Sequence, residues 1–221
     1  MKKILIVVSF VALLGIIGCG GSATSSSSPY FPLSLGNKWS YKTTGKTETY
    51  MNDSLISETD ISTTTDYEIT QKTTLSNGTE VWEQKSVTRV DTTTTESYSY
   101  IYVGDSIEIY FNKDDSTAAT KIPKDPKKGD KWFYTVNDST KTVYEVVGTE
   151  DVTIEEGSYT GCLKIKVSTE INGTAQEGIE QYLYWAKNVG QVKATYNATM
   201  EYGTVKTVTE QTTELTGKEL K

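Results

Sequence analysis

Apolar and polar residues alternate along much of the chain after residue 30. In residues 162–167, Leu163, Ile165 and Val167 are separated by lysines, and residues 192–198 repeat the pattern. A period of two places successive side chains on opposite faces of a strand, one toward a core and one toward water. No segment after residue 30 shows the apolar stripe of an amphipathic helix, so we predict an all-β fold.

Turn signals separate these alternating runs. Asn77-Gly78 and Asn172-Gly173 each stand between two runs, and Glu201-Tyr202-Gly203 lies between the last two. Asn-Gly tolerates the positive φ angles that a type I′ hairpin turn requires. The pattern predicts an antiparallel meander of about ten to twelve strands. Such a meander can form a curved sheet, an open barrel or a sandwich.

The first 18 residues have the organisation of a secretory signal peptide. Lys2 and Lys3 precede residues 4–17, which are apolar except for Ser9. This run is shorter than the about 20 residues that a membrane-spanning helix needs, and it matches the apolar region of a signal peptide. We therefore expect residues 1–18 to be removed.

The sequence Ile16-Ile17-Gly18-Cys19 resembles the lipobox of bacterial lipoproteins. The resemblance implies cleavage before Cys19, a diacylglycerol thioether on its sulfur, and an acyl chain such as palmitate on the new amino terminus. The alternative is an ordinary signal peptide that ends near a cysteine. Because Gly20 rather than Asp follows the cysteine, the resemblance implies an outer-membrane location if the host is Gram-negative. In any host it implies a protein anchored in the cell envelope.

Residues 19–29 form a linker rich in Gly and Ser, and residues 30–221 form the predicted β domain. A linker of this composition behaves as a flexible coil with a reach of about 15–20 Å. The whole chain carries a formal charge of −7. An acidic surface repels phosphate, so we expect no nucleic-acid partner.

A short motif recurs within the β domain. Gly36-Asn37-Lys38-Trp39-Ser40-Tyr41 is similar to Gly129-Asp130-Lys131-Trp132-Phe133-Tyr134. In each copy the Gly with Asn or Asp favours a turn, and the Trp and Tyr fall on the same face of the strand that follows. The recurrence suggests two repeated halves, 30–121 and 122–221, either as separate sheets or as one continuous sheet; chance similarity is the alternative.

Three segments resemble a group of uncharacterised bacterial lipoproteins whose mature domain begins F-P-L-x-x-G-N-x-W-x-Y. The segments are residues 30–41, 156–165 and 182–193. The resemblance implies an antiparallel β domain in the cell envelope. The group has no agreed activity, so the resemblance implies no catalytic residue.

Enzymatic signatures are weak in this sequence. The chain has no histidine, which excludes Ser-His-Asp triads and His-ligated metal sites. Gly45-Lys46-Thr47 resembles the end of a phosphate-binding loop but lies within a strand pattern. Asp114-Asp115 and Glu155-Glu156 stand near predicted turns, where we expect solvated carboxylates with ordinary pKa values rather than an acid/base pair or a calcium site. We predict no enzymatic activity, no metal and no cofactor.

Cys162 and a group of tyrosines are the remaining candidates. With Cys19 used for lipid attachment, Cys162 is unpaired; we expect a buried, inert thiol, with an intermolecular disulfide as the alternative. Tyr98, Tyr100 and Tyr102 fall on one face of a strand and could form a binding surface for sugars or lipid, or simply cover the sheet.

Two functional classes remain. The first is a lipid-anchored, non-enzymatic envelope protein that binds either a protein partner along a sheet edge or an apolar ligand in a curved sheet. The second is a structural or surface-coat lipoprotein without a small-molecule ligand. A closed sheet with an open apolar interior would favour ligand carriage, whereas a filled core would not.

Overall fold

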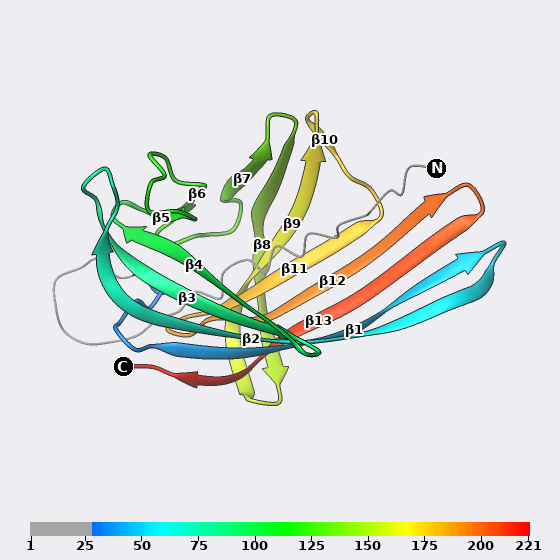
Figure 1. Cartoon of the computed structure of the whole chain (residues 1–221), viewed down its shortest axis with the longest axis horizontal. Helices are drawn as coiled ribbons and strands as arrows, with labels where there is room; N and C mark the ends of the chain where they lie inside the picture. The colour runs from blue at the N-terminus through cyan, green and yellow to red at the C-terminus, as the bar shows by residue number, and fades with distance from the viewer. Residues whose placement is uncertain (1–27) are drawn as a thin grey trace.

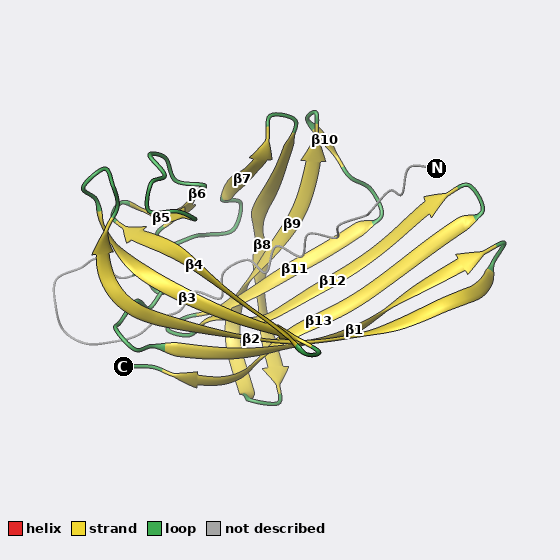
Figure 2. Ribbon diagram, viewed as in Figure 1, coloured by secondary structure: helices red, strands yellow, loops and turns green. Residues whose placement is uncertain are grey.

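The structure is a computed structural model that describes residues 28–221, and all of its regular secondary structure is β. Figure 2 shows strands joined by turns and loops, without a helix in the described part. None of these residues therefore belongs to a helix that could cross a membrane. The strands are β1 (Lys38–Met51), β2 (Ser54–Thr74), β3 (Glu80–Val90), β4 (Thr93–Val103), β5 (Ser106–Tyr110), β6 (Thr120–Pro123), β7 (Lys131–Asn137), β8 (Thr140–Ile154), β9 (Gly157–Ile171), β10 (Thr174–Ala175), β11 (Ile179–Ala186), β12 (Gly190–Tyr202) and β13 (Val205–Glu219).

Twelve of these strands close into a single antiparallel barrel. The sheet order is β10-β9-β11-β12-β13-β1-β2-β3-β4-β5-β6-β7-β8, and β8 also pairs with β9. Only the short β10 lies outside the ring, where it pairs with the end of β9. The predicted all-β antiparallel meander is confirmed, and the sheet is one continuous barrel rather than a sandwich.

The two copies of the Gly-Asn/Asp-Lys-Trp motif adopt the same local structure. Gly36 N–H donates to the Ile69 carbonyl, and Ile69 N–H donates to the Asn37 carbonyl. Gly129 and Asp130 make the matching pair of bonds with Val146. Both glycines have positive φ angles, 77° and 94°. Each motif thus starts a strand in the same way, β1 in the first copy and β7 in the second, although the two halves share one sheet. Whether 30–121 and 122–221 are a true repeat stays a prediction.

Most of the turns predicted from the Asn-Gly and Tyr-Gly sequences are observed at those positions. Asn77-Gly78 joins β2 to β3, and the β12–β13 turn follows Tyr202. Asn172-Gly173 differs, because it leads into β10 and not directly into β11. Gly178, with φ of 75° and its carbonyl bonded to Thr199 N–H at 2.7 Å, redirects the chain before β11 begins.

The chain before β1 is part of the barrel core. Ser28 is buried, and its hydroxyl donates to the Lys124 carbonyl at 2.5 Å. Phe31 is fully buried, and its ring meets Trp185 edge to face at 5.0 Å. Ser28 and Phe31 therefore pack as part of the barrel. The predicted signal peptide 1–18 and Cys19 lie outside the described residues.

Four strands project beyond the rest of the barrel. We call this part the wing: residues 44–51 of β1, 54–62 of β2, 199–202 of β12 and 205–212 of β13. At its base, β3 stops pairing with β2 at Thr63, and the pairing of β11 with β12 ends at Ala198. Figure 1 shows the β1–β2 and β12–β13 hairpins extending together on the right. The turns are linked by a 3.0 Å bond from Asn52 N–H to the Thr204 carbonyl.

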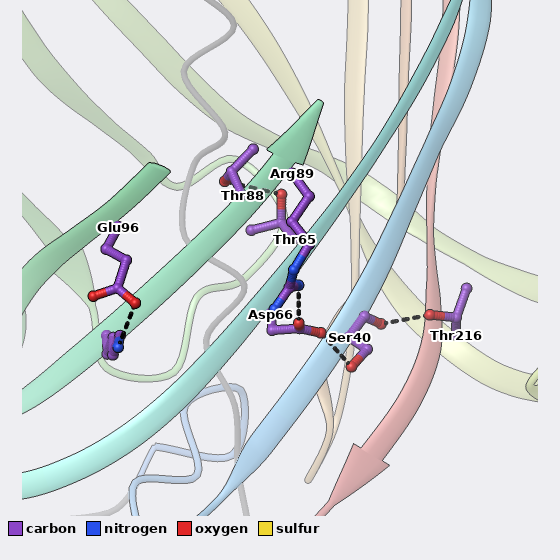
Figure 3. A network of polar contacts seen from close by, with 8 residues as sticks. Ser40, Thr65, Asp66, Thr88, Arg89, Glu96 and Thr216 are labelled. Atoms are coloured by element: carbon purple, nitrogen blue, oxygen red, sulfur yellow. Dashed lines mark hydrogen bonds and ion pairs between the residues drawn. The ribbon is translucent and has the colours of Figure 1, made fainter. Parts of the chain in front are cut away.

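Polar contacts cross the sheet near the start of the wing (Figure 3). Asp66 on β2 accepts a hydrogen bond from Ser40 on β1 at 2.6 Å and forms an ion pair with Arg89 on β3. Thr216 on β13 donates to the Ser40 carbonyl at 3.1 Å. These contacts join four adjacent strands on the outer face and supplement the backbone hydrogen bonds of the sheet.

Candidate functional site

The three predicted binding tyrosines lie on the outer face of β4, but only one is exposed. Tyr98 is 44% exposed, whereas Tyr100 is 8% exposed and Tyr102 is partly buried. Tyr100 belongs to a small apolar cluster on this face, together with Leu75, Val81 and Tyr110. The face is therefore mostly covered, and a binding role at Tyr98 stays a prediction.

The loop of residues 111–119 packs against the cluster around Tyr100, through Lys113 over the Tyr100 ring and through Ala118. It reaches the β2–β3 turn, where Ser76 N–H donates to the Lys113 carbonyl at 2.9 Å and the Ser76 hydroxyl bonds Asp114. Asp115 shapes the loop by accepting from the backbone N–H groups of Phe111 and Asn112 at 3.1 and 2.9 Å. Asp114 and Asp115 thus bond to protein groups, and none of the described residues forms a cluster of three potential metal ligands.

Glu83, also on this face, is the one carboxylate among the buried residues of 28–221, with 7% exposure. Sequence analysis did not single out this residue, which lies within a strand and not near a turn. Its carboxylate accepts from Thr70 Oγ1 at 2.8 Å and Gln71 Nε2 at 2.9 Å, and Lys113 Nζ lies 3.6 Å away. Desolvation raises the pKa of Glu83, but these hydrogen bonds and the lysine charge outweigh it and hold the pKa below its ordinary value. The group is an ionised anchor for the covering loop.

Replacing Glu83 with glutamine should therefore destabilise the protein at neutral pH by about 1–3 kcal/mol, because a charged acceptor with several donors is lost. A lowered pKa in the folded state stabilises the fold above the ordinary pKa of 4.5, and this contribution disappears as the pH falls through the lower folded-state value. Urea unfolding at pH 7 and pH 3 measures this difference, which should be much smaller at pH 3.

Glu96→Gln is the matched control for this measurement. The Glu96 side chain is 51% exposed and pairs with Lys85 at 2.8 Å (Figure 3). An exposed pair contributes about 0–1 kcal/mol, so this variant should stay close to the parent at both pH values. A Glu83→Gln variant as stable as the parent at pH 7 would show that Glu83 does not hold the loop.

Cys162 is buried and unpaired, as predicted. Its thiol donates to the Tyr159 carbonyl at 3.5 Å. Burial, with the nearby charge of Asp151, raises the pKa of the Cys162 thiol to about 11. The thiolate is the reactive form of cysteine, so this environment favours an inert side chain. The carboxylate of Glu156, on the β8–β9 turn, forms an ion pair with Lys218 of β13.

The apolar part of the barrel interior is filled by the protein's own side chains. Tyr30 and Phe31 pack in one buried cluster with Trp132, Tyr144 and Trp185. Trp132 stacks on Tyr144 with ring centroids 5.6 Å apart and lies 5.8 Å from Trp185. The binding of an apolar ligand requires an open apolar pocket, and a core filled by the protein's own side chains does not provide one.

Toward the wing, threonine hydroxyl groups replace apolar side chains on the inner face of the sheet. Thr43 bonds Thr213 at 2.8 Å, and Thr47 bonds Thr209 at 3.1 Å across the β1–β13 pair. A groove of about 370 Å³ lies beside these strands, where β11 begins, and Glu180, Asn197 and Glu210 are among its lining residues. Neither region offers the apolar lining of a lipid-carrying barrel.

Exposed apolar side chains gather at the end of the wing. We call this group the apolar tip; it consists of Met51, Leu55, Ile56, Met200 and Tyr202, with exposures of 45%, 51%, 55%, 37% and 86%. These are five of the twelve large apolar side chains that are exposed among residues 28–221. Met51 and Tyr202 both lie opposite Val205, so the two hairpins contribute to one face of the wing, whereas Leu55 lies opposite Tyr50 and projects from the other face. Several exposed apolar side chains gathered at one end of a fold are typical of an interaction site.

Sequence reasoning missed the apolar tip. The signal that could have found it is the adjacent pair Leu55-Ile56, which breaks the alternation just after a turn. A bulge lies there, since Thr49 pairs with Ser57 and Tyr50 with Leu55. The contribution of Met200 and Tyr202 could not be found locally, because it depends on pairing between β1 and β13, which are far apart in the chain.

No protein-family model matches the chain, and no curated protein matches it. A solved "putative lipoprotein" of Parabacteroides distasonis is similar with 16% identity and a TM-score of 0.46, covering 87% of this chain and 99% of its own. A solved "putative exported protein with YmcC-like fold" of Bacteroides fragilis is similar with 13% identity, a TM-score of 0.47 and the same coverage. At such low values, the fold and the site described above rest on this chain's own strand pairing and side chains.

Proposed function

We propose that this protein is a lipid-anchored, non-enzymatic protein of the cell envelope that binds a protein partner through its apolar tip. The exposed apolar tip is the observation that carries the proposal. The lipid anchor follows from the lipobox at Cys19, and the location is the outer membrane if the host is Gram-negative. An apolar ligand is the weaker alternative, because the chain's own aromatic side chains fill the core.

The direction of the wing supports a partner away from the anchoring membrane. The chain enters the barrel at the end where Asn188 N–H donates to the Pro29 carbonyl at 2.7 Å. β1 then runs 14 residues to the apolar tip at the other end, a length of about 45 Å. Because the proposed anchor Cys19 lies only nine positions before Ser28, the entry end would lie near the lipid and the tip would face away from it.

Photocrosslinking in the host tests the proposal. A photoreactive amino acid at position 202 should give a discrete crosslinked protein band, because Tyr202 is 86% exposed at the apolar tip. The same amino acid at position 133 is the control, since Phe133 is 59% exposed but lies on β7, outside the wing. A Met200→Thr substitution should weaken the band from position 202, because it removes apolar contact area from the interface.

The outcomes separate the alternatives. Equal bands from positions 202 and 133 would contradict a specific interface at the apolar tip. Crosslinks from position 202 to lipid alone would replace the protein partner with a membrane surface. The absence of any crosslink would favour the structural or surface-coat role.

A further inference from the structure

One edge of the wing is an unpaired strand. Residues 54–62 of β2 pair with β1 on one side, but the pairing of β2 with β3 starts only at Thr63. On the open side these residues have no neighbouring strand within the described structure. An edge of this kind presents backbone N–H and C=O groups in the geometry that a further strand would need.

Two of the usual protections of an edge strand, lysine and proline, are missing here. Natural edges carry charged residues, above all lysine, or proline, or are twisted away by bulges. Residues 54–62 contain neither Lys nor Pro. A bulge occurs at Ile56, so the stretch from Ser57 to Ser62 remains regular and exposed or half-exposed. This edge can therefore accept an added strand.

The charge around the edge selects the kind of strand. Glu58 and Asp60 are two residues apart, so both project from the outer face of β2. They lie opposite Glu48 and Lys46 of β1, and Lys46 in turn lies opposite Glu210 of β13. This outer-face patch therefore holds four carboxylates and one lysine, which pairs with Glu48 and lies 3.8 Å from Glu58, so the patch keeps a net negative charge.

We propose that the free edge of β2, residues 54–62, binds an extended basic segment of a protein partner, which adds to the sheet as a further strand. This inference rests on the proposed function and specifies the partner's chemistry. Lys or Arg at alternate positions of the segment would face Glu58 and Asp60. The intervening residues would face Thr59 and Ile61 on the inner face, where β-branched side chains pair well.

A second copy of this chain is a poor occupant of the same edge. Two copies of residues 54–62 in antiparallel pairing would bring Glu58 and Asp60 close to the same carboxylates of the other copy. Like charges directly opposite each other destabilise strand pairing. The acidic edge thus discourages self-association while attracting a basic strand.

Synthetic peptides test this inference on the purified Cys19→Ser protein. The probe is a peptide that matches the edge in length and alternates Lys with Val and Thr; its controls replace Lys with Glu, or N-methylate alternate backbone amides at unchanged charge. We expect the Lys peptide to bind, the Glu peptide not to bind, and the N-methylated peptide to lose binding because one of its edges can no longer donate hydrogen bonds. Amide exchange should slow at alternate residues within 54–62 when the Lys peptide binds.

Charge reversal gives the matched protein variant. Glu58→Lys combined with Asp60→Lys should weaken the Lys peptide by about tenfold at low salt and allow the Glu peptide to bind instead. Equal binding of the methylated and unmethylated peptides, or protection outside residues 54–62, would overturn strand addition. So would an absence of any binding of the Lys peptide.

The peptide result and the crosslinking result are independent. A Tyr202→Ser protein should bind the Lys peptide as the parent does, because Tyr202 lies on β12 and not on the edge strand. Crosslinks from position 202 without peptide binding would contradict strand addition at residues 54–62 and leave the protein interface at the apolar tip. Peptide binding without those crosslinks would contradict the interface at the apolar tip and leave strand addition.

Discussion

Replacing Trp39 or Trp132 with alanine is expected to lower the free energy of unfolding by about 3–5 kcal/mol in each case. Trp39 is 1% exposed and Trp132 is 4% exposed, so each substitution removes a large buried ring and leaves a cavity. A domain is typically stable by about 5–15 kcal/mol, and either loss is a large share of that. Chemical unfolding of the soluble protein measures the change.

The two effects should be similar because the two tryptophans occupy similar positions. Trp39 follows the Gly36 turn and lies opposite Tyr67, and Trp132 follows the Gly129 turn and lies opposite Tyr144. Phe133→Ala is the control, because this neighbouring aromatic ring is 59% exposed. A tryptophan variant as stable as Phe133→Ala would show that its ring is not part of the core.

Replacing Cys19 with serine is expected to release the protein from the membrane fraction completely. Each buried methylene of an acyl chain contributes about 0.8 kcal/mol, and stable anchoring requires two membrane-binding signals. A serine offers no thioether, and the net charge of −7 gives no attraction to anionic lipid. Fractionation after a high-salt wash without detergent measures the distribution.

Cys162→Ala is the matched control, since it removes the other cysteine from a buried site. This variant should remain in the membrane fraction like the parent. A Cys19→Ser protein that stays membrane-bound after the wash would refute the lipobox interpretation. Intact mass of the released protein would show whether the signal peptide is still cleaved.

The fold class could be predicted because its causes are local. Alternation at Leu163, Ile165 and Val167 places these side chains in the core, and all three are buried. Asn77-Gly78 favours a turn by itself, because both residues tolerate the positive φ angles of a type I′ turn. Closure of the barrel could not be predicted, because it depends on β13 pairing with β1 and β8 pairing with β9, and sequence patterns do not reveal which strands pair.

The site was harder to predict for the same reason. The tyrosines at 98, 100 and 102 do share one face, as their spacing requires. The burial of Tyr100 depends on the loop of residues 111–119, whose Lys113 Nζ lies 5.5 Å from the centre of the Tyr100 ring. The free edge at 54–62 likewise exists only because β3 is shorter than β2. Length differences between paired strands leave little signal in a single sequence.

The burial of the chain just before β1 determines how a pulling force would pass through the molecule. A force applied between the entry at Pro29 and the apolar tip runs nearly parallel to β1, which is paired along its whole length with β13 and β2. Interstrand hydrogen bonds are perpendicular to the strands, so this direction loads many of them together in shear instead of opening them one at a time. Before β1 is loaded, the force must also extract the Phe31 ring from beside Trp185. A pull along the line from tether to tip is thus resisted by many interstrand hydrogen bonds at once.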